Sequence, residues 1–368
     1  MIKRLQINND VLVSYIKNSG IEFDILQDTV KDISQFVSGE KMPTFNQLAK
    51  ISRLINIPTG LLVLQQQVTI NPQRLSFRTP NSATIDKMSA ELRDTIIDMQ
   101  EKQSFLQNQI NDMIDLSSDR LKHENDPMAI AEAIRSRLQI PIDYISYAKN
   151  NPLRYFRNKL SDIGIFVFFN GKIHDNTHRP LSSDEFRGFS LKSDKAPIIF
   201  VNQKDSPNAQ LFTLVHELVH LFIDDEGIST VSEHDDFDHI QREAIVNRVA
   251  AEILVPKILF EKEPSPEIKE LAGKYSVSQY VIARRLLDIG MIDKLAYYKI
   301  VSSLKPSIKP RKKPSGGNYN SNLRFRIDHT FFRFVHNAIM QDKVSYTEAL
   351  RLIGTSYKGF KYLEGELL

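Results

Sequence analysis

The residues best suited to chemistry lie in one apolar run, from Leu211 to Ile223. His216 and His220 stand four positions apart in it, and Glu217 directly follows the first histidine. Because residues i and i+4 share one face of an α-helix, both imidazoles can bind the same cation. Bound zinc would lower the pKa of water toward ~7, and a neighbouring glutamate could then take its proton. The spacing therefore predicts His216 and His220 as metal ligands and Glu217 as a general base.

The apolar flanks of this motif predict a buried helix. Two histidines and a glutamate are costly there unless they are paired or bound to a metal. The alternative is a histidine pair without a metal, which leaves those polar groups unexplained. A catalytic zinc ion takes three protein ligands and keeps one position open, so the motif needs a third ligand.

The third ligand must be His, Asp or Glu, because the sequence has no cysteine. The first three acidic residues beyond His220 continue the same helix, and residues 233–238 read as an acidic, solvated loop. A second helix is predicted from about Phe237 to Val255, because Pro256 ends the pattern. The candidates over this whole stretch are Asp224, Asp225, Glu226, Glu233, His234, Asp235, Asp236, Asp238, His239, Glu243 and Glu252.

One face of the second helix holds the best candidate. We expect Glu243 to be the third ligand, and Asn247 to hydrogen-bond its carboxylate or a ligand histidine. Glu252 lies on a different face and is the second choice. The residues that share the inward face at helical spacing are Glu243, Asn247, Ala250 and Leu254.

Short strands precede the metal-binding helix. Residues 164–169 have the pattern of a buried strand, and Asn170-Gly171 after them is a dipeptide typical of hairpin turns. Residues 186–191 and 197–201 read as further strands, and most of the remaining chain has helical periodicity. The predicted fold class is α+β, mostly helical, with a small strand set.

Residues 1–67 are predicted to form a separate domain of short helices. The pattern suits a helix-turn-helix domain, with a recognition helix near Asp32 to Val37. The segment has seven basic and six acidic residues, so its net charge is close to zero. Its attraction to DNA should be weak, because phosphate contacts dominate DNA affinity. DNA binding through residues 1–67 and a helical protein-interaction domain both stay open.

Four further segments complete the predicted organisation. Residues 68–125 combine a connector (68–82) with a long helix from Ile85 to Leu116, which suits either a homo-oligomer contact or packing on its own chain. Residues 126–300 would form the metal-binding domain, with two short cap helices at its end. Residues 301–321 read as a basic Pro/Gly linker, and residues 322–368 as a small helical unit.

The composition limits the classes of protein. The chain has 368 residues, with 48 Lys and Arg against 45 Asp and Glu, and 41% of its residues are hydrophobic. These values are ordinary for a soluble globular protein. No apolar run reaches the ~20 residues of a membrane span. We therefore expect a cytoplasmic protein without a membrane partner.

The two metal-site segments together resemble the ImmA/IrrE family of zinc metallopeptidases. These segments are His216-Glu-Leu-Val-His220 and Glu243-Ala-Ile-Val-Asn247. Other segments resemble its larger members, which carry an N-terminal XRE-like helix-turn-helix region. These segments are Pro43-Thr-Phe-Asn-Gln-Leu48, Ser76-Phe-Arg-Thr79, Glu185-Phe-Arg-Gly-Phe189, Ala196-Pro-Ile-Ile-Phe-Val-Asn202, Gly316-Gly-Asn-Tyr319 and Ser345-Tyr-Thr-Glu-Ala-Leu350.

The resemblance implies a gluzincin-like α+β core with one zinc ion per chain, held by His216, His220 and Glu243, with Glu217 as the base. It also implies an endopeptidase that cleaves an XRE-type repressor or antitoxin and so relieves repression. The alternative is a DNA-binding transcriptional regulator or antitoxin that uses the same scaffold without proteolysis.

Overall fold

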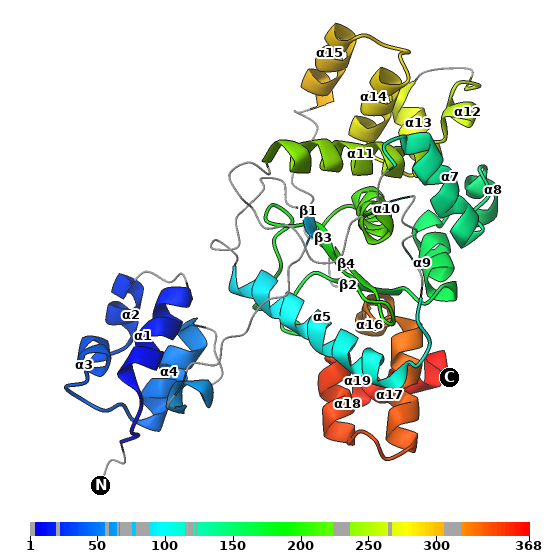
Figure 1. Ribbon diagram of the computed structural model, residues 1–368. Coiled ribbons are helices and arrows are strands. Elements are labelled where there is room, and N and C mark those ends of the chain that lie inside the picture. The colour runs from blue at the N-terminus through cyan, green and yellow to red at the C-terminus, as the bar shows by residue number, and fades with distance from the viewer. Residues whose placement is uncertain are drawn as a thin grey trace. The chain divides into compact units, whose positions relative to one another are not determined.

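The chain divides into two compact units (Figure 1): Met1–Gln73 with Ala83–Arg93, and Arg74–Ser82 with Asp94–Leu368. We refer to them as unit 1 and unit 2. The basic stretch of the predicted linker, residues 305–317, lies outside the described residues. The computed structural model describes residues 4–19, 23–55, 59–64, 66, 76–78, 89–114, 116, 121, 124–223, 236–263, 267–304 and 318–368.

Unit 1 is helical and has its own core. Leu12, Phe36 and Leu48 are fully buried in it. The side chain of Asn8 caps the first helix by accepting hydrogen bonds from the backbone of the first turn. The short helices predicted for residues 1–67 are confirmed, whereas their helix-turn-helix assignment stays a prediction. The elements are α1 (Asn9–Asn18), α2 (Phe23–Thr29), α3 (Ile33–Ser38), α4 (Phe45–Ile55) and η1 (Leu61–Val63).

Unit 2 contains a four-stranded sheet of order β1-β3-β4-β2. Strands β2 and β4 are parallel, and β3 is antiparallel to both β1 and β4. The three strands predicted before the metal-binding helix are confirmed. The fourth lies within the expected connector, where three residues are too few to show an alternating pattern. The strands are β1 (Ser76–Arg78), β2 (Phe166–Asn170), β3 (Gly188–Leu191) and β4 (Ile198–Asn202).

The hairpin predicted at Asn170-Gly171 is wrong. Strand β2 pairs in parallel with β4, with Phe168 opposite Phe200, and a parallel pair requires a crossover connection. The side chain of Asn170 instead donates a hydrogen bond to the carbonyl oxygen of His174, at 2.9 Å. The dipeptide therefore begins a loop, and packing of the sheet decides which strand β2 pairs with.

Helices cover both faces of the sheet (Figure 1). Val167 and Val201 belong to the same core cluster as the buried residues of α10 (Pro207–Ile223). Phe168, one residue along, packs its ring against Phe331 of α17 (His329–Met340), with ring centroids 5.2 Å apart. Because side chains alternate along a strand, the burial of consecutive residues reflects cover on both sides. This explains why β2 and β4 read as continuous apolar runs.

The remaining helices surround this core, and α5 begins among residues of unit 1. No helix among the described residues combines the length and apolar character that a bilayer span needs. The helices are α5 (Ala90–Gln109), α7 (Pro127–Leu138), α8 (Tyr144–Ala148), α9 (Pro152–Asp162), α11 (Asp236–Leu254), α12 (Lys257–Phe260), α13 (Ile268–Tyr275), α14 (Gln279–Asp288), α15 (Lys294–Leu304), α16 (Tyr319–Arg326), α18 (Tyr346–Ile353) and α19 (Tyr357–Leu367).

Helix α5 is shorter than predicted. It ends at Gln109, because the following Asn111-Asp112 favours a turn and the backbone of Ile114 then bonds to that of Asp194. Within the helix, Gln103 is buried and donates hydrogen bonds to carbonyl oxygens around the β3–β4 connection. The helix therefore packs on its own chain, and a homo-oligomer contact stays a prediction.

Buried polar contacts join the C-terminal helices to the sheet. The carboxylate of Asp328 accepts hydrogen bonds from Phe331 N at 2.9 Å, which caps α17, and from Val167 N of β2 at 3.0 Å. Arg157 of α9 donates to the carbonyl oxygens of Phe325 and Val167. The helices predicted for residues 322–368 are present and are fixed to β2. Domain boundaries within residues 94–368 stay predictions.

Candidate metal centre

The motif residues lie on α10, whose residues from Gln210 to Ile223 are all buried. Ser206 begins the helix, because its hydroxyl oxygen accepts a hydrogen bond from Ala209 N at 3.3 Å. Pro207 occupies the first turn, where no backbone N–H bond is needed. The helix therefore starts close after β4 and packs against the sheet and α11. Its burial is what the apolar flanks of the motif predicted.

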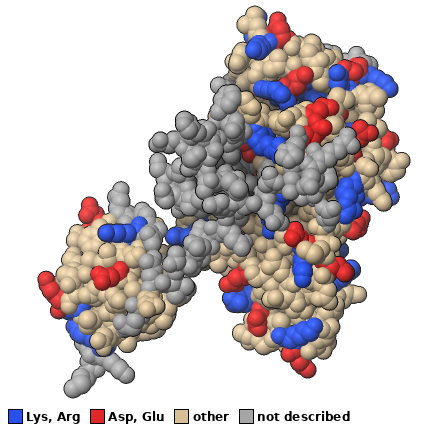
Figure 2. Space-filling model, in the orientation of Figure 1, with Lys and Arg blue, Asp and Glu red and all other residues tan. Residues whose placement is uncertain are grey.

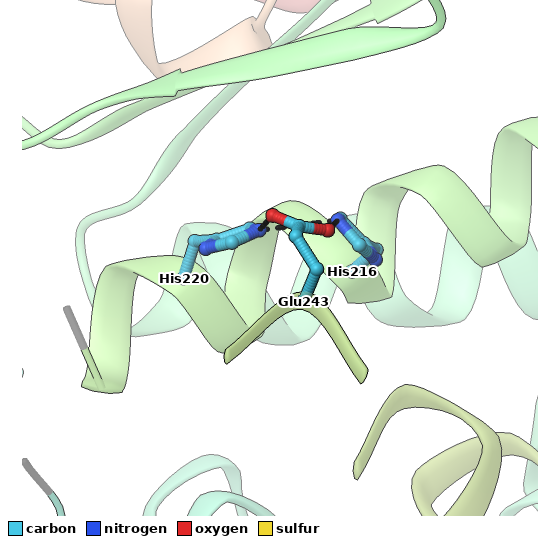
Figure 3. Close-up of side chains that lie close together, drawn as sticks. All are labelled: His216, His220 and Glu243. Carbon is cyan, nitrogen blue, oxygen red and sulfur yellow. Dashed lines mark hydrogen bonds and ion pairs between the residues drawn. The ribbon is translucent and has the colours of Figure 1, made fainter. Parts of the chain in front are cut away.

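Three side chains from two helices meet at one point (Figure 3). Nε2 of His216 and Nε2 of His220 are 3.1 Å apart on α10. Glu243 of α11 extends its carboxylate between them, with Oε2 3.5 Å from the His216 nitrogen and Oε1 3.1 Å from the His220 nitrogen. The structure thus brings together the two histidines and the third ligand that the sequence predicted.

The spacing of these atoms suits a single metal ion. Ligand atoms 2.0–2.2 Å from a tetrahedral zinc ion lie about 3.3–3.5 Å from one another. The three separations here are 3.1, 3.1 and 3.5 Å, so one lies in that range and two are slightly shorter. The histidine side chains are 0% and 5% exposed, whereas the Glu243 side chain is 25% exposed. The three residues can therefore hold a metal ion between two buried imidazoles and a partly exposed carboxylate.

Helix α11 positions Glu243 by packing along α10. Val246, Val249 and Ala250 are fully buried and belong to the core that contains α10. The neighbouring residue Arg242 donates a hydrogen bond to the carbonyl oxygen of Ile223, the last residue of α10. This bond satisfies a helix-terminal carbonyl and joins the first half of α11 to the end of α10. The turn that carries Glu243 is thereby held over the histidines.

Glu217 is completely buried and lies against β3. Its Oε2 accepts a hydrogen bond from the hydroxyl of Ser190, at 3.1 Å. Gly188, two residues earlier on the same face of β3, has no side chain, and a Cβ there would lie 3.5 Å from Cγ of Glu217. The strand therefore allows close approach of α10 at Gly188 and offers a hydrogen-bond donor at Ser190. Sequence reasoning missed Ser190, although a hydroxyl in a fully buried strand requires a polar partner.

Asn247 has a different partner from the one we expected. Its side-chain nitrogen donates to the backbone carbonyl oxygen of Glu243, at 2.8 Å, and the residue is exposed. The sequence-based expectation of a bond to the Glu243 carboxylate or to a ligand histidine is therefore wrong. The physical reason is local: an Asn one turn along a helix can reach the backbone of residue i−4 without leaving solvent.

Glu252, the second choice for the third ligand, is buried elsewhere. It forms an ion pair with Arg285 of α14, and it accepts a hydrogen bond from Lys257 N at 3.2 Å. Arg285 also donates to the carbonyl oxygen of Val255, at 3.0 Å. Burial lowers the pKa of Arg285 to about 10. Glu252 therefore joins the end of α11 to α14.

The other candidates for the third ligand are not described. Candidates 224–235 lie outside the described residues, as do the side chains of Asp236, Asp238 and His239.

These features define a class of protein: an α+β fold in which a helix on a small sheet and a neighbouring helix supply a His-His-Glu metal site. Residues 162–287 match the family model described as the IrrE N-terminal-like domain, a family of peptidases. The match contains β2, β3, β4, α10 and α11, and it supports a metallopeptidase of the IrrE/ImmA type. No curated protein and no solved structure matched the chain.

Proposed function

We propose that the protein is a zinc-dependent endopeptidase that hydrolyses a peptide bond in a regulatory protein. The observation that carries the proposal is the convergence of His216, His220 and Glu243, with the buried carboxylate of Glu217 on the same helix. Two neutral imidazoles and a carboxylate are a donor set typical of catalytic zinc sites. A structural zinc site would require a fourth protein ligand, which the described residues do not supply.

The residues of the chain divide the chemistry among them. His216, His220 and Glu243 would hold the ion, which when bound supplies a Lewis acid that polarises the scissile carbonyl and acidifies water. Glu217 would accept a proton from the attacking water molecule as the new C–O bond forms. It would then donate that proton to the leaving amine as the C–N bond breaks. The products are one carboxylate and one amine.

For the substrate, we propose an XRE-type repressor or antitoxin, so that cleavage relieves repression. This part of the proposal is supported by the resemblance of the two metal-site motifs and the flanking segments to the ImmA/IrrE family. We expect residues 1–67 to act in recognition of a partner. Cytoplasmic location is part of the same proposal, because such regulators act on DNA.

The experiment compares zinc-loaded wild-type protein with Glu217→Gln in a lysate of the source organism, and mass spectrometry identifies new protein N-termini. The variant should keep its zinc and lose cleavage, since a general base contributes about 10²–10⁴-fold to a rate. Equal cleavage by both proteins would refute the mechanism. If wild type cleaves proteins but no transcriptional regulator, the endopeptidase stands and the proposed substrate class is wrong.

The alternative, DNA binding without proteolysis, depends on unit 1. Among its described residues, the face visible in Figure 2 carries acidic and basic side chains side by side. In α3, where the recognition helix was predicted, Ser34 and Gln35 are exposed and Ser34 accepts a hydrogen bond from Gln27. Binding of the full chain to DNA, with its dependence on salt concentration, would measure this alternative directly.

A further inference from the structure

Strand β3 presents an unusual face to α10. Side chains alternate along the strand, so Phe189 and Leu191 lie on one face while Gly188 and Ser190 lie on the other. Phe189 stacks with Phe200, with ring centroids 5.2 Å apart. The opposite face carries only a hydrogen atom and a hydroxymethyl group, and it is the face that receives Glu217.

The contact between Ser190 and Glu217 is enclosed. Ser190 is 7% exposed and Glu217 is 0% exposed, and the hydroxyl is 3.1 Å from Oε2. A hydrogen bond from a hydroxyl to a carboxylate is stronger than one between neutral groups, and low solvent access preserves that strength. The bond therefore restricts rotation of the Glu217 carboxylate about its side-chain torsions.

The backbone of strand β3 is fixed by hydrogen bonds, so the position of Ser190 is well defined. Its backbone pairs with β4 from Gly188 to Leu191, with Ser190 opposite Ile199. On the far side of the sheet, Gln103 of α5 donates to the carbonyl oxygen of Leu191, at 3.1 Å. A hydroxyl on such a strand can orient a carboxylate more accurately than one on a loop.

We propose that Ser190 is a positioning residue, which holds the carboxylate of Glu217 in the orientation needed for proton transfer. The inference rests on the proposed function, because it assigns a role in that same reaction. Ser190 acts through Glu217, because its hydroxyl donates to that carboxylate. Loss of its hydroxyl should therefore reduce the rate of the chemical step, while zinc binding and substrate binding persist.

The test uses the zinc-loaded full chain and a peptide that spans the bond cleaved by wild type. In Ser190→Ala, kcat should fall by ~10–100-fold, the range found for residues that orient groups in a metal site. KM and zinc content should stay unchanged. Ser190→Thr keeps a hydroxyl and should recover most of kcat. The matched control is Ser161→Ala, which loses a hydroxyl contact to Thr330 away from the site and should leave kcat unchanged.

A structural measurement separates this inference from the proposed function. Crystal structures of wild type and Ser190→Ala should show the Glu217 carboxylate displaced or in several rotamers in the variant alone. An unmoved carboxylate, or a wild-type kcat in Ser190→Ala, would overturn the inference. If wild type cleaves no protein, the proposed function fails, and the crystal structures alone then decide whether Ser190 orients Glu217.

Discussion

Replacement of Gly188 by alanine tests how closely α10 packs on β3. The new Cβ would lie 2.5 Å from Cγ2 of Thr213 and 2.8 Å from the carbonyl oxygen of Phe200. Both distances are shorter than a carbon atom tolerates, and the second neighbour is backbone of the same sheet, which cannot rotate away. Overpacking a core costs about 1–3 kcal/mol, and two simultaneous clashes place Gly188→Ala near 2–3 kcal/mol.

Urea unfolding of the full chain, followed by circular dichroism, measures this loss. The matched control is Gly273→Ala within α13, where a Cβ would meet no atom within 4 Å. Alanine is the better helix former, so the control should gain about 0.5–1 kcal/mol. The same substitution in the same unit should therefore change the free energy of unfolding in opposite directions at the two positions.

A double variant identifies the clash. Thr213→Ser removes Cγ2 and keeps the hydroxyl, so Gly188→Ala should cost less in that background than in wild type. Part of the loss in unfolding free energy should remain, because the clash with the Phe200 carbonyl oxygen is unchanged. Zinc binding should persist, since the new Cβ would lie at an ordinary contact distance of 3.5 Å from Cγ of Glu217. An unfolding free energy of Gly188→Ala equal to or above that of wild type would refute the reasoning.

Three further predictions concern the metal, a buried ion pair and pH. Zinc at a hundred times its dissociation constant should stabilise the chain by about 2.7 kcal/mol in thermal unfolding, and a chelator or His216→Ala should abolish this gain. Arg285→Ala should cost about 3–5 kcal/mol in urea unfolding by leaving Glu252 buried without its cation, and a double replacement by Met should recover most of it. Burial opposes ionisation of Asp175, but hydrogen bonds from Lys172 and Tyr319 outweigh it and lower its pKa below 3.8. The stability it contributes is therefore present above pH 3.8 and lost as pH falls further, so Asp175→Asn should unfold with a weaker pH dependence in that range.

The parts of the site that lie on one helix could be predicted from the sequence. His216 and His220 share a face of α10 by their spacing alone, and the apolar residues around them required burial. Glu243 was predictable for a related reason: its position relative to Ala250 and Leu254 placed it on the packed face of α11. In both cases the information lies within a single periodic segment.

Contacts between distant segments could not be predicted in this way. The pairing of β2 with β4 depends on the crossover between them, so the local turn preference of Asn170-Gly171 gave the wrong partner strand. The hydrogen bond from Ser190 to Glu217 joins residues 27 positions apart on different elements. Helix α15 was not predicted either, and none of its residues is buried.

The third ligand shows how the two kinds of information combine. Spacing on α11 selects which residues face inward, but it does not determine which turn of α11 crosses the histidines. That register depends on contacts between the helices: the bond from Arg242 to the end of α10, and the buried Val246 and Ala250 that pack beneath it. Glu252 satisfies the same residue-type requirement yet pairs with Arg285, because it lies more than two turns farther along. The register between α10 and α11 therefore determines which acidic residue of α11 can bind the metal.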